Sequence, residues 1–231
     1  MKIITDHERI ARGARLGKIA TFVGLGILVG GLVISLALQD TPLLWLSFAC
    51  LLLGLVISSV GTMNMNRWVR EPRADQALAQ GLKGFDDRYR LYNHSLPAPH
   101  VLLSPQGLFV LTAMGQEGNI HYDGTKFRRD FSLGRALRFM AEEGLGKPFS
   151  EGDSQVAALQ EALEEHGTSE GVEIHNILVF YNPRTQLSVS HPPRPVVAPK
   201  GVKKAIRRLA NTKLPRGQYD ELVSLFEGEE G

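Results

Sequence analysis

The stretch HVLLSPQGLFVLTAM, residues 100–114, decides the fold. Two almost continuously apolar runs, HVLL and LFVLTAM, flank the tetrapeptide Ser104-Pro105-Gln106-Gly107. Proline at the second position presets φ for a turn and glycine closes it, so the stretch predicts a tight β-hairpin. Strands that are apolar at nearly every position are covered on both faces. This hairpin should therefore lie in the middle of a sheet.

Composition bounds what surrounds that hairpin. A chain of 231 residues with 43% hydrophobic content can build one sizeable core and has length left over. The net charge of +2 does not mark the chain as a nucleic-acid binder. The only cysteine, Cys50, lies in an apolar run, so no intramolecular disulfide can form, which fits a reducing compartment.

Two long runs without charged residues precede the hairpin, at 19–39 and 41–66. Each run is long enough to cross a hydrocarbon layer of about 30 Å as a helix. The connection, with Asp40 and Pro42, is too short for anything but a turn. A cleaved signal peptide is the competing interpretation of the first run, but that run lacks an obvious cleavage site and is followed at once by the second. The sequence predicts a transmembrane hairpin over residues 19–66.

Basic residues flank the two runs, whereas the loop between them carries only Asp40. By the positive-inside rule, both termini face the cytoplasm. We therefore expect a two-pass protein of the cell (inner) membrane with a basic cytoplasmic N-terminus over residues 1–18 and a cytoplasmic domain after the second span. The flanking residues are Arg9, Arg12, Arg15 and Lys18 before the first run, and Arg67, Arg70 and Arg73 after the second.

Small residues recur inside both spans. Gly26 and Gly30 form a GxxxG motif, and a four-residue period in the second span is made by Cys50, Gly54, Ser58 and Thr62. Such faces let helix backbones approach closely, either within the hairpin or between it and a second copy or a partner membrane protein. Neither span holds an ionisable residue, which disfavours an ion path.

After the second span, the sequence pattern predicts a mixed α/β (α+β) domain over residues 72–199, followed by a helical extension with an acidic tail over 200–231. The pattern is α-β-β-β-α-β. Asp123-Gly124 predicts a hairpin with a two-residue loop. Proline-rich sequence up to Pro199 predicts an irregular segment. The predicted elements are a helix from Pro72 to Leu82, strands at 88–93 and 172–181, a helix from Ser132 to Gly144, a helix from Asp153 or Ser154 to before Gly167, and helices at 201–210 and 218–226.

Four stretches carry a family resemblance: RADQALAQGL, HVLLSPQGLFVLTAMGQEGNI, GDSQVAALQEAL and ILVFYNP. Together they resemble the nuclease-related domain (NERD), a branch of the PD-(D/E)xK nuclease-like superfamily. The resemblance covers roughly Ala74 to Tyr181 and reaches Phe226. It implies a nuclease-like mixed sheet with two carboxylates for Mg²⁺ and one lysine for the attacking water.

The three catalytic positions implied by the resemblance are all substituted. Pro99 stands at the aspartate position before the histidine, Thr112 at the acidic position and Met114 at the lysine position. None of these side chains carries a charge. The pattern therefore predicts a domain without catalysis or cofactor, acting as a binding or scaffold module.

Two alternatives remain open. Asp75 and Glu117 are candidates for relocated carboxylates, which would make the protein a Mg²⁺-dependent DNA endonuclease. However, they do not have the two-residue spacing that places both side chains on one face of a strand. The other alternative is a structural membrane protein that assembles through its spans. No small-molecule substrate is evident.

Two basic clusters are candidate surfaces for weak, non-specific binding of nucleic acid or anionic lipid. The first is Lys126, Arg128 and Arg129, and the second is Lys200, Lys203, Lys204, Arg207 and Arg208. The second cluster lies opposite an apolar helix face. His94, His100 and His121 surround the core strands without Cys or carboxylate partners at metal-ligand spacing, so they do not predict a zinc site.

Overall fold

The computed structural model describes residues 1–37, 44–130, 144–210 and 213–228. It is a mixed α/β structure with two compact units. One unit, the sheet domain, comprises Met1–Asp6, Ala74–Asp130 and Leu145–Gly231. The other comprises His7–Arg73 with Phe131–Gly144 and contains the two long N-terminal helices.

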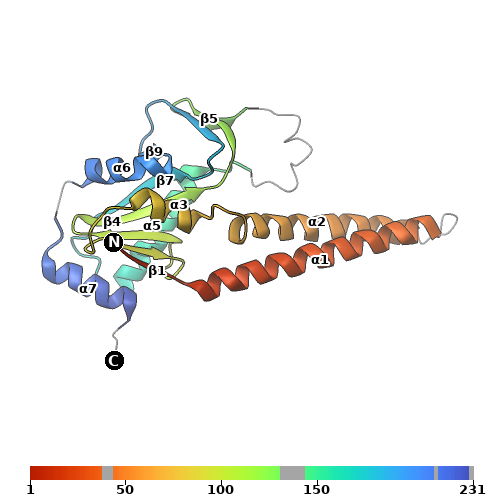
Figure 1. Cartoon of the computed structure of the whole chain (residues 1–231), viewed down its shortest axis with the longest axis horizontal. Helices are drawn as coiled ribbons and strands as arrows, with labels where there is room; N and C mark the ends of the chain where they lie inside the picture. The colour runs from red at the N-terminus through yellow and green to blue at the C-terminus, as the bar shows by residue number, and fades with distance from the viewer. Residues whose placement is uncertain (38–43, 131–143, 211–212, 229–231) are drawn as a thin grey trace. The chain divides into compact units, whose positions relative to one another are not determined.

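A six-stranded sheet in the order β1-β2-β3-β4-β7-β9 forms the centre of the sheet domain (Figure 1). The predicted hairpin is confirmed as β3 and β4, and both strands are internal to the sheet. All of β3 is buried, as is all of β4 except Ala113. The strands are β1 (Lys2–Thr5), β2 (Arg90–Asn93), β3 (His100–Ser104), β4 (Gly107–Met114), β7 (Ile174–Phe180) and β9 (Val196–Val197).

The hairpin turn has the predicted composition. Ser104 pairs with Gly107, which leaves Pro105 and Gln106 as the turn residues. The Ser104 hydroxyl accepts a hydrogen bond from the Gln106 N–H at 3.1 Å and donates to the Gly107 carbonyl at 3.1 Å. Gly107 has φ 129°, and a Cβ there would lie 2.9 Å from the Glu173 carbonyl oxygen. Both observations require glycine at this position.

Helices cover both faces of the sheet because successive strand residues point to opposite sides. Leu102, Phe109 and Leu111 pack with α3 (Ala74–Leu82) and α6 (Val202–Leu209). Val101, Leu108 and Val110 pack with α5 (Pro148–Glu165) and α7 (Arg216–Glu227). The short 3₁₀ helix η1 (Pro199–Gly201) leads into α6. Strands β2, β3 and β4 are antiparallel neighbours, and β7 joins β4 in parallel.

A second sheet in the order β6-β5-β8 contains the predicted Asp123-Gly124 hairpin. The predicted two-residue loop is wrong, because Tyr122 pairs with Phe127 and four residues connect the strands. The Asp123 carboxylate accepts hydrogen bonds from the Thr125 hydroxyl and the backbone N–H groups of Thr125 and Lys126, and these bonds stabilise the longer loop. The strands are β5 (Gly118–Tyr122), β6 (Phe127–Arg129) and β8 (Thr185–Val189).

Two further predictions need correction. Helix α5 begins at Pro148 and not at Asp153 or Ser154, since proline occupies its first turn and Gly152 is tolerated within it. The proline-rich segment before Pro199 is not wholly irregular, because it contributes β8 and β9. The helix predicted from Ser132 and the turn at Asp40 and Pro42 lie outside the described residues.

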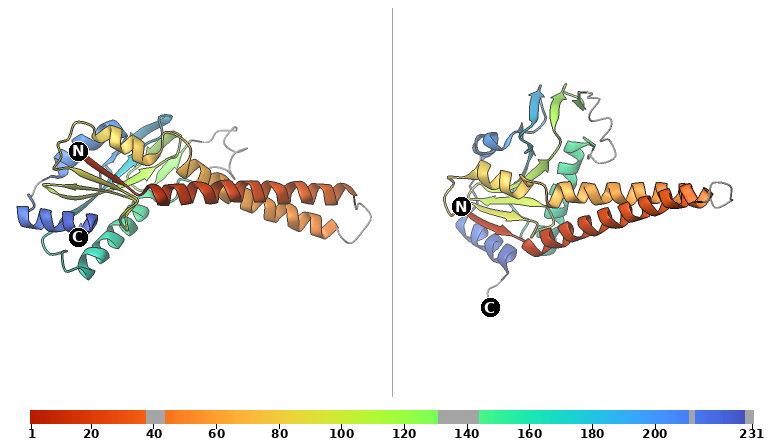
Figure 2. Two further views of the ribbon diagram at one scale, coloured as in Figure 1. Left: turned by 60° about the horizontal axis from the view of Figure 1, so that its bottom comes forward. Right: turned by 45° about the vertical axis from the view of Figure 1, so that its right-hand side comes forward.

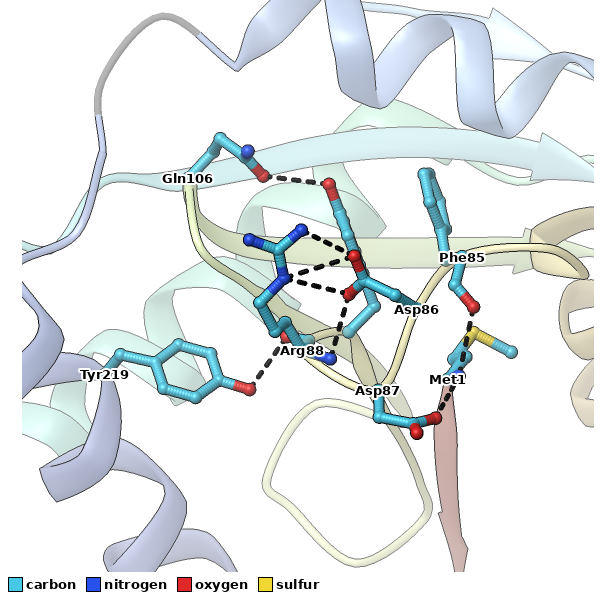
Figure 3. A network of polar contacts seen from close by, with 8 residues as sticks. Met1, Phe85, Asp86, Asp87, Arg88, Gln106 and Tyr219 are labelled. Carbon is cyan, nitrogen blue, oxygen red and sulfur yellow. Dashed lines mark hydrogen bonds and ion pairs between the residues drawn. The ribbon is translucent and has the colours of Figure 1, made fainter.

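Strand β1 has no counterpart among the predicted elements. Residues 1–18 were expected to form one basic segment, but Lys2–Thr5 pair in parallel with Arg90–Asn93, and helix α1 begins at His7. The amino group of Met1 donates hydrogen bonds to the Phe85 carbonyl at 3.0 Å and to the Asp87 carboxylate at 2.9 Å (Figure 3). Nearby, the Tyr219 hydroxyl donates to the Arg88 carbonyl at 2.7 Å. This network joins β1 and α7 to the segment that leads into β2.

The other unit contains α1 (His7–Ala37) and α2 (Leu44–Trp68), which run side by side (Figures 1 and 2). By length and composition, each helix is able to cross a membrane. Glycines form the contact between them. Gly24 lies against Ser58, Gly54 against Leu28 and Gly61 against Thr21, in each case too closely to admit a Cβ. Larger side chains on this seam would separate the helices.

The seam only partly matches the predicted small-residue faces. Cys50, Gly54 and Ser58 of α2 do face α1, as expected if the two helices pack against each other within the hairpin. Gly26 and Gly30 do not contribute, because no atom lies within 4 Å of a Cβ built at either position. The α1 contacts come instead from Gly17, Gly24 and Gly31, which recur every seven residues. The GxxxG motif therefore lies off the α1–α2 contact.

Cross-linking tests this register. A Cβ at Gly31 would lie 3.0 Å from the Cβ of Cys50, slightly closer than in an ordinary disulfide. We expect Gly31→Cys to form an intramolecular disulfide with Cys50 under mild oxidation, measured as loss of reactive thiols. Gly30→Cys is the matched control and should keep both thiols within the monomer. Equal oxidation of the two variants would contradict the register.

An ionic cluster fixes the end of α7 to the sheet edge. The Glu227 carboxylate accepts hydrogen bonds from Lys2 at 2.6 Å, from Tyr92 at 3.1 Å and from Arg90. Burial acts to raise the pKa of Glu227, but the bonds from Lys2 and Arg90 outweigh it, so that pKa lies below its ordinary value of 4.5. A carboxylate whose pKa is lowered in the folded state stabilises the fold above pH 4.5. This contribution is lost as the pH falls through the lowered pKa.

The stability of α7 should therefore depend on pH. At pH 7, Glu227→Gln should reduce the protection of α7 amides in hydrogen exchange by about 1–2 kcal/mol, because two charge-assisted bonds are lost. As the pH falls below 4.5 to pH 3, the difference between the wild type and the variant should decrease. The control is Glu165→Gln, at the exposed end of α5, which should leave α7 unchanged. A difference of equal size at both pH values would contradict this role.

Candidate functional site

The fold brings the three positions that the family resemblance singled out to one region of the sheet. Pro99 directly precedes β3, and Thr112 and Met114 lie near the end of β4. Val101 pairs with Val110, and two residues further along the strands are Pro99 and Thr112. Met114 is 3% exposed and packs with Ile120 and Phe180. The position to which the resemblance assigned a lysine is therefore part of an apolar cluster.

Thr112 is fully buried and belongs to a neutral hydrogen-bond network. Its hydroxyl donates to the Gln155 side-chain carbonyl at 2.9 Å and accepts from the Asn176 amide at 2.8 Å. The same Asn176 amide nitrogen donates to the Val110 carbonyl at 3.2 Å. Both hydrogen-bond partners of the Thr112 hydroxyl are therefore side-chain amides, and neither is a carboxylate. Buried polar groups satisfied in this way stabilise a fold and need no ligand.

A guanidinium lies beside this network. Arg194, from the segment between β8 and β9, contacts the Asn176 side-chain carbonyl at 3.4 Å and the Asp153 carboxylate at 2.6 Å. Its guanidinium carbon lies 5.6 Å from the centre of the Phe149 ring. Gly152 approaches the Asn176 side chain too closely to admit a Cβ, so α5 lies directly against β7 here. The positive charge of Arg194 opposes binding of a second cation at this place.

Asp75 and Glu117, the candidates for relocated carboxylates, do not form a metal site with other described residues. Asp75 is buried in the first turn of α3. Glu117 follows β4 and lies 3.5 Å from the guanidinium of Arg184. Within the described part of the chain, no group of three or more His, Cys, Asp or Glu side chains could hold a metal ion.

The histidines around the core strands have structural contacts. The rings of His94 and His100 lie 4.8 Å apart, edge to face. Nδ1 of His100 is 2.8 Å from the Asn93 side-chain oxygen. His121 belongs to the other sheet, where it lies 3.3 Å from Asp130.

The first basic cluster is engaged within the fold. Arg128 lies 3.3 Å from the Asp123 carboxylate, and Arg129 donates to the Glu117 carbonyl at 2.7 Å. As neighbours in β6, the two arginines point to opposite faces of the strand. Lys126 is exposed in the loop before them. These three residues therefore do not present one continuous basic surface.

The second basic cluster lies on and just before α6. Val202, Ala205 and Ile206 of this helix are buried, whereas Lys200, Lys204, Arg207 and Arg208 are exposed. Lys203 differs from these four cations, because its ammonium group donates to the Lys83 carbonyl just past α3 and lies 5.7 Å from the centre of the Phe85 ring. Lys203 therefore has a structural role and does not belong to the free surface.

Sequence reasoning missed Gln155, Asn176 and Arg194. Asn176 offered one signal, since it is an amide inside the apolar strand IHNILVF and a buried amide requires partners. Gln155 and Arg194 offered none, because each resembles an ordinary surface residue of its segment. Only the fold shows that they surround Thr112.

No protein-family model, curated protein or solved structure matches the chain.

Removing the Thr112 hydroxyl tests whether its network is structural. Thr112→Val has nearly the same shape but removes one hydrogen bond each from the Gln155 side-chain oxygen and the Asn176 amide, so we expect a loss of about 1–3 kcal/mol in the free energy of unfolding. The control is Thr112→Ser, which keeps the hydroxyl and should cost less. Chemical denaturation of the full chain in detergent measures both variants. A serine variant no more stable than the valine variant would contradict the structural role of the hydroxyl.

Proposed function

We propose that the protein is a membrane-anchored, cytoplasmic domain of the NERD type that has lost catalysis and acts as a binding or scaffold module. One observation carries this proposal. The acidic and lysine positions of the motif are occupied by Thr112, which is satisfied by neutral amides, and by Met114, which is buried in an apolar cluster. Neither side chain can ligate a metal through a carboxylate or position water through an amine.

The topology of the sheet domain supports the nuclease-like assignment. Apart from β5 and β6, which belong to the second sheet, the order α3-β2-β3-β4-α5-β7 follows the expected α-β-β-β-α-β pattern. Its first three strands form an antiparallel meander, and β7 then joins β4 in parallel. The region corresponding to the motif lies where β3 begins and β4 ends.

The chain path supports the proposed membrane anchor. Helices α1 and α2 are inserted between β1 and α3, which belong to the same compact unit. If both helices cross the bilayer, the chain returns to the side from which it started. By the positive-inside rule, the basic flanks favour the cytoplasm as that side. Removal of α1 as a signal sequence would also remove β1 from the sheet, which argues against that alternative.

A second candidate function, assembly through the two spans, is favoured by one specific observation. Gly26 and Gly30 lie on α1 with open space around them, so this face is free of α2. Assembly through the spans, with a second copy or a partner membrane protein, would use such a face. This role is compatible with the proposed binding module.

A cleavage assay tests the loss of catalysis. The purified full chain should leave supercoiled DNA intact with Mg²⁺ or Mn²⁺, because no carboxylate pair or lysine stands at the motif positions. Asp75→Ala and Glu117→Ala are assayed in parallel. Metal-dependent cutting by the wild type that disappears in either variant would show that the catalytic carboxylates have moved, and the endonuclease alternative would then hold.

A further inference from the structure

The C-terminal part of the sheet domain includes a long stretch without carboxylates. From Ile174 to Tyr219 there is no Asp or Glu, but there are nine Lys and Arg residues. The rest of the chain has 24 Asp and Glu against 17 Lys and Arg. The near-neutral net charge therefore conceals a strongly basic segment whose centre is η1 and α6.

Helical spacing places part of this charge on one surface. With 3.6 residues per turn, Lys204, Arg207 and Arg208 project from the side of α6 opposite Val202, Ala205 and Ile206. Those three apolar residues are 0%, 7% and 1% exposed, so the core fixes which side faces outward. Lys200, in η1 directly before the helix, is exposed as well. We call Lys200, Lys204, Arg207 and Arg208 the α6 basic face.

The α6 basic face differs from the three other arginines of the same stretch in its lack of ionic partners. Arg184, Arg194 and Arg216 lie within 4.0 Å of Glu117, Asp153 and Asp220, respectively. By contrast, no residue of the α6 basic face forms an ion pair with any residue that the structure describes. Four neighbouring cations without counter-charges repel one another, and an anionic surface would relieve that repulsion.

The connections to α1 and α2 keep the sheet domain near any bilayer that holds them. Only Asp6 separates the end of β1 from α1, and residues 69–73 separate α2 from α3. Such short connections give a weak surface a high effective concentration of the lipids around the anchor. A nucleic acid in solution gains no such advantage.

We propose that the α6 basic face docks on anionic lipid headgroups of the bilayer that holds α1 and α2. This inference rests on the membrane anchor in the proposed function. Binding is purely electrostatic, because the apolar side of α6 is part of the domain core and is not available for insertion into lipid. The docked state therefore requires anionic lipid and weakens as salt rises.

Vesicle binding by the full chain tests the proposal. The chain is reconstituted into phosphatidylcholine nanodiscs and mixed with phosphatidylcholine vesicles that contain either no phosphatidylserine or about one third phosphatidylserine. Lys204→Gln with Arg208→Gln removes two charges from the α6 basic face. Lys126→Gln with Arg128→Gln removes two charges elsewhere and is the matched control. Lys203 is left intact because of its contact with Lys83.

We expect co-sedimentation with the phosphatidylserine vesicles only, weakened roughly 10- to 30-fold by the α6 variant and less than about twofold by the control. Equal weakening by the two variants would overturn the proposal, as would binding without phosphatidylserine. Displacement of the vesicles by duplex DNA at a lower phosphate concentration would also overturn it, in favour of a nucleic-acid partner. A chain that fails to enter the nanodiscs would instead contradict the membrane anchor.

Discussion

The parallel pairing of β1 with β2 is the constraint on which the rest of the structure depends. Four residues at the start of the chain join a sheet whose other strands all follow α2. Because this pairing closes the chain path, α1 and α2 must form a hairpin that leaves the sheet domain and returns to it. The contact of Glu227 with Lys2 and Arg90 then connects the last helix to the same edge. The two ends of the described chain therefore stabilise one sheet edge, and the apolar hairpin is an insertion within a single fold.

The same sheet explains how it accommodates Thr112 and Met114 near the end of β4. In β4, Thr112 and Met114 point to the face that α5 covers, where a charged side chain would need a partner or a metal ion. The present residues avoid that requirement, because a hydroxyl meets two amides and a thioether meets aromatic and aliphatic carbon. Arg194 adds a positive charge beside the network. A stable site of this kind suits a domain whose surface, rather than whose core, makes the functional contact.

Strong local patterns allowed much of the fold to be predicted from the sequence. The hairpin of β3 and β4 is confirmed because proline and glycine define its turn and the strands are apolar throughout. Strand β1 was missed because four residues ahead of a basic helix carry no periodicity, and only pairing with β2 makes them a strand. The α1 contact at Gly24 was not predicted, because glycine spacing alone does not show which side of a helix meets its neighbour. For the site, the substituted positions stay a prediction from the resemblance, and Asn176 could not be linked to its partners because they come from segments distant in the chain.

The most direct test of this account is the membrane side of the two segments that form the sheet. Single-cysteine variants on a Cys50→Ser background would place the label at Lys2 in β1, at Lys204 in α6 or at Thr41 between the helices. Treatment of intact cells with an impermeant thiol reagent should label the cysteine at position 41 and spare those at 2 and 204 until lysis. Labelling of position 2 or 204 before lysis would contradict a cytoplasmic sheet domain. Labelling of only one of those two positions would contradict the pairing of β1 with β2 in a membrane-anchored protein.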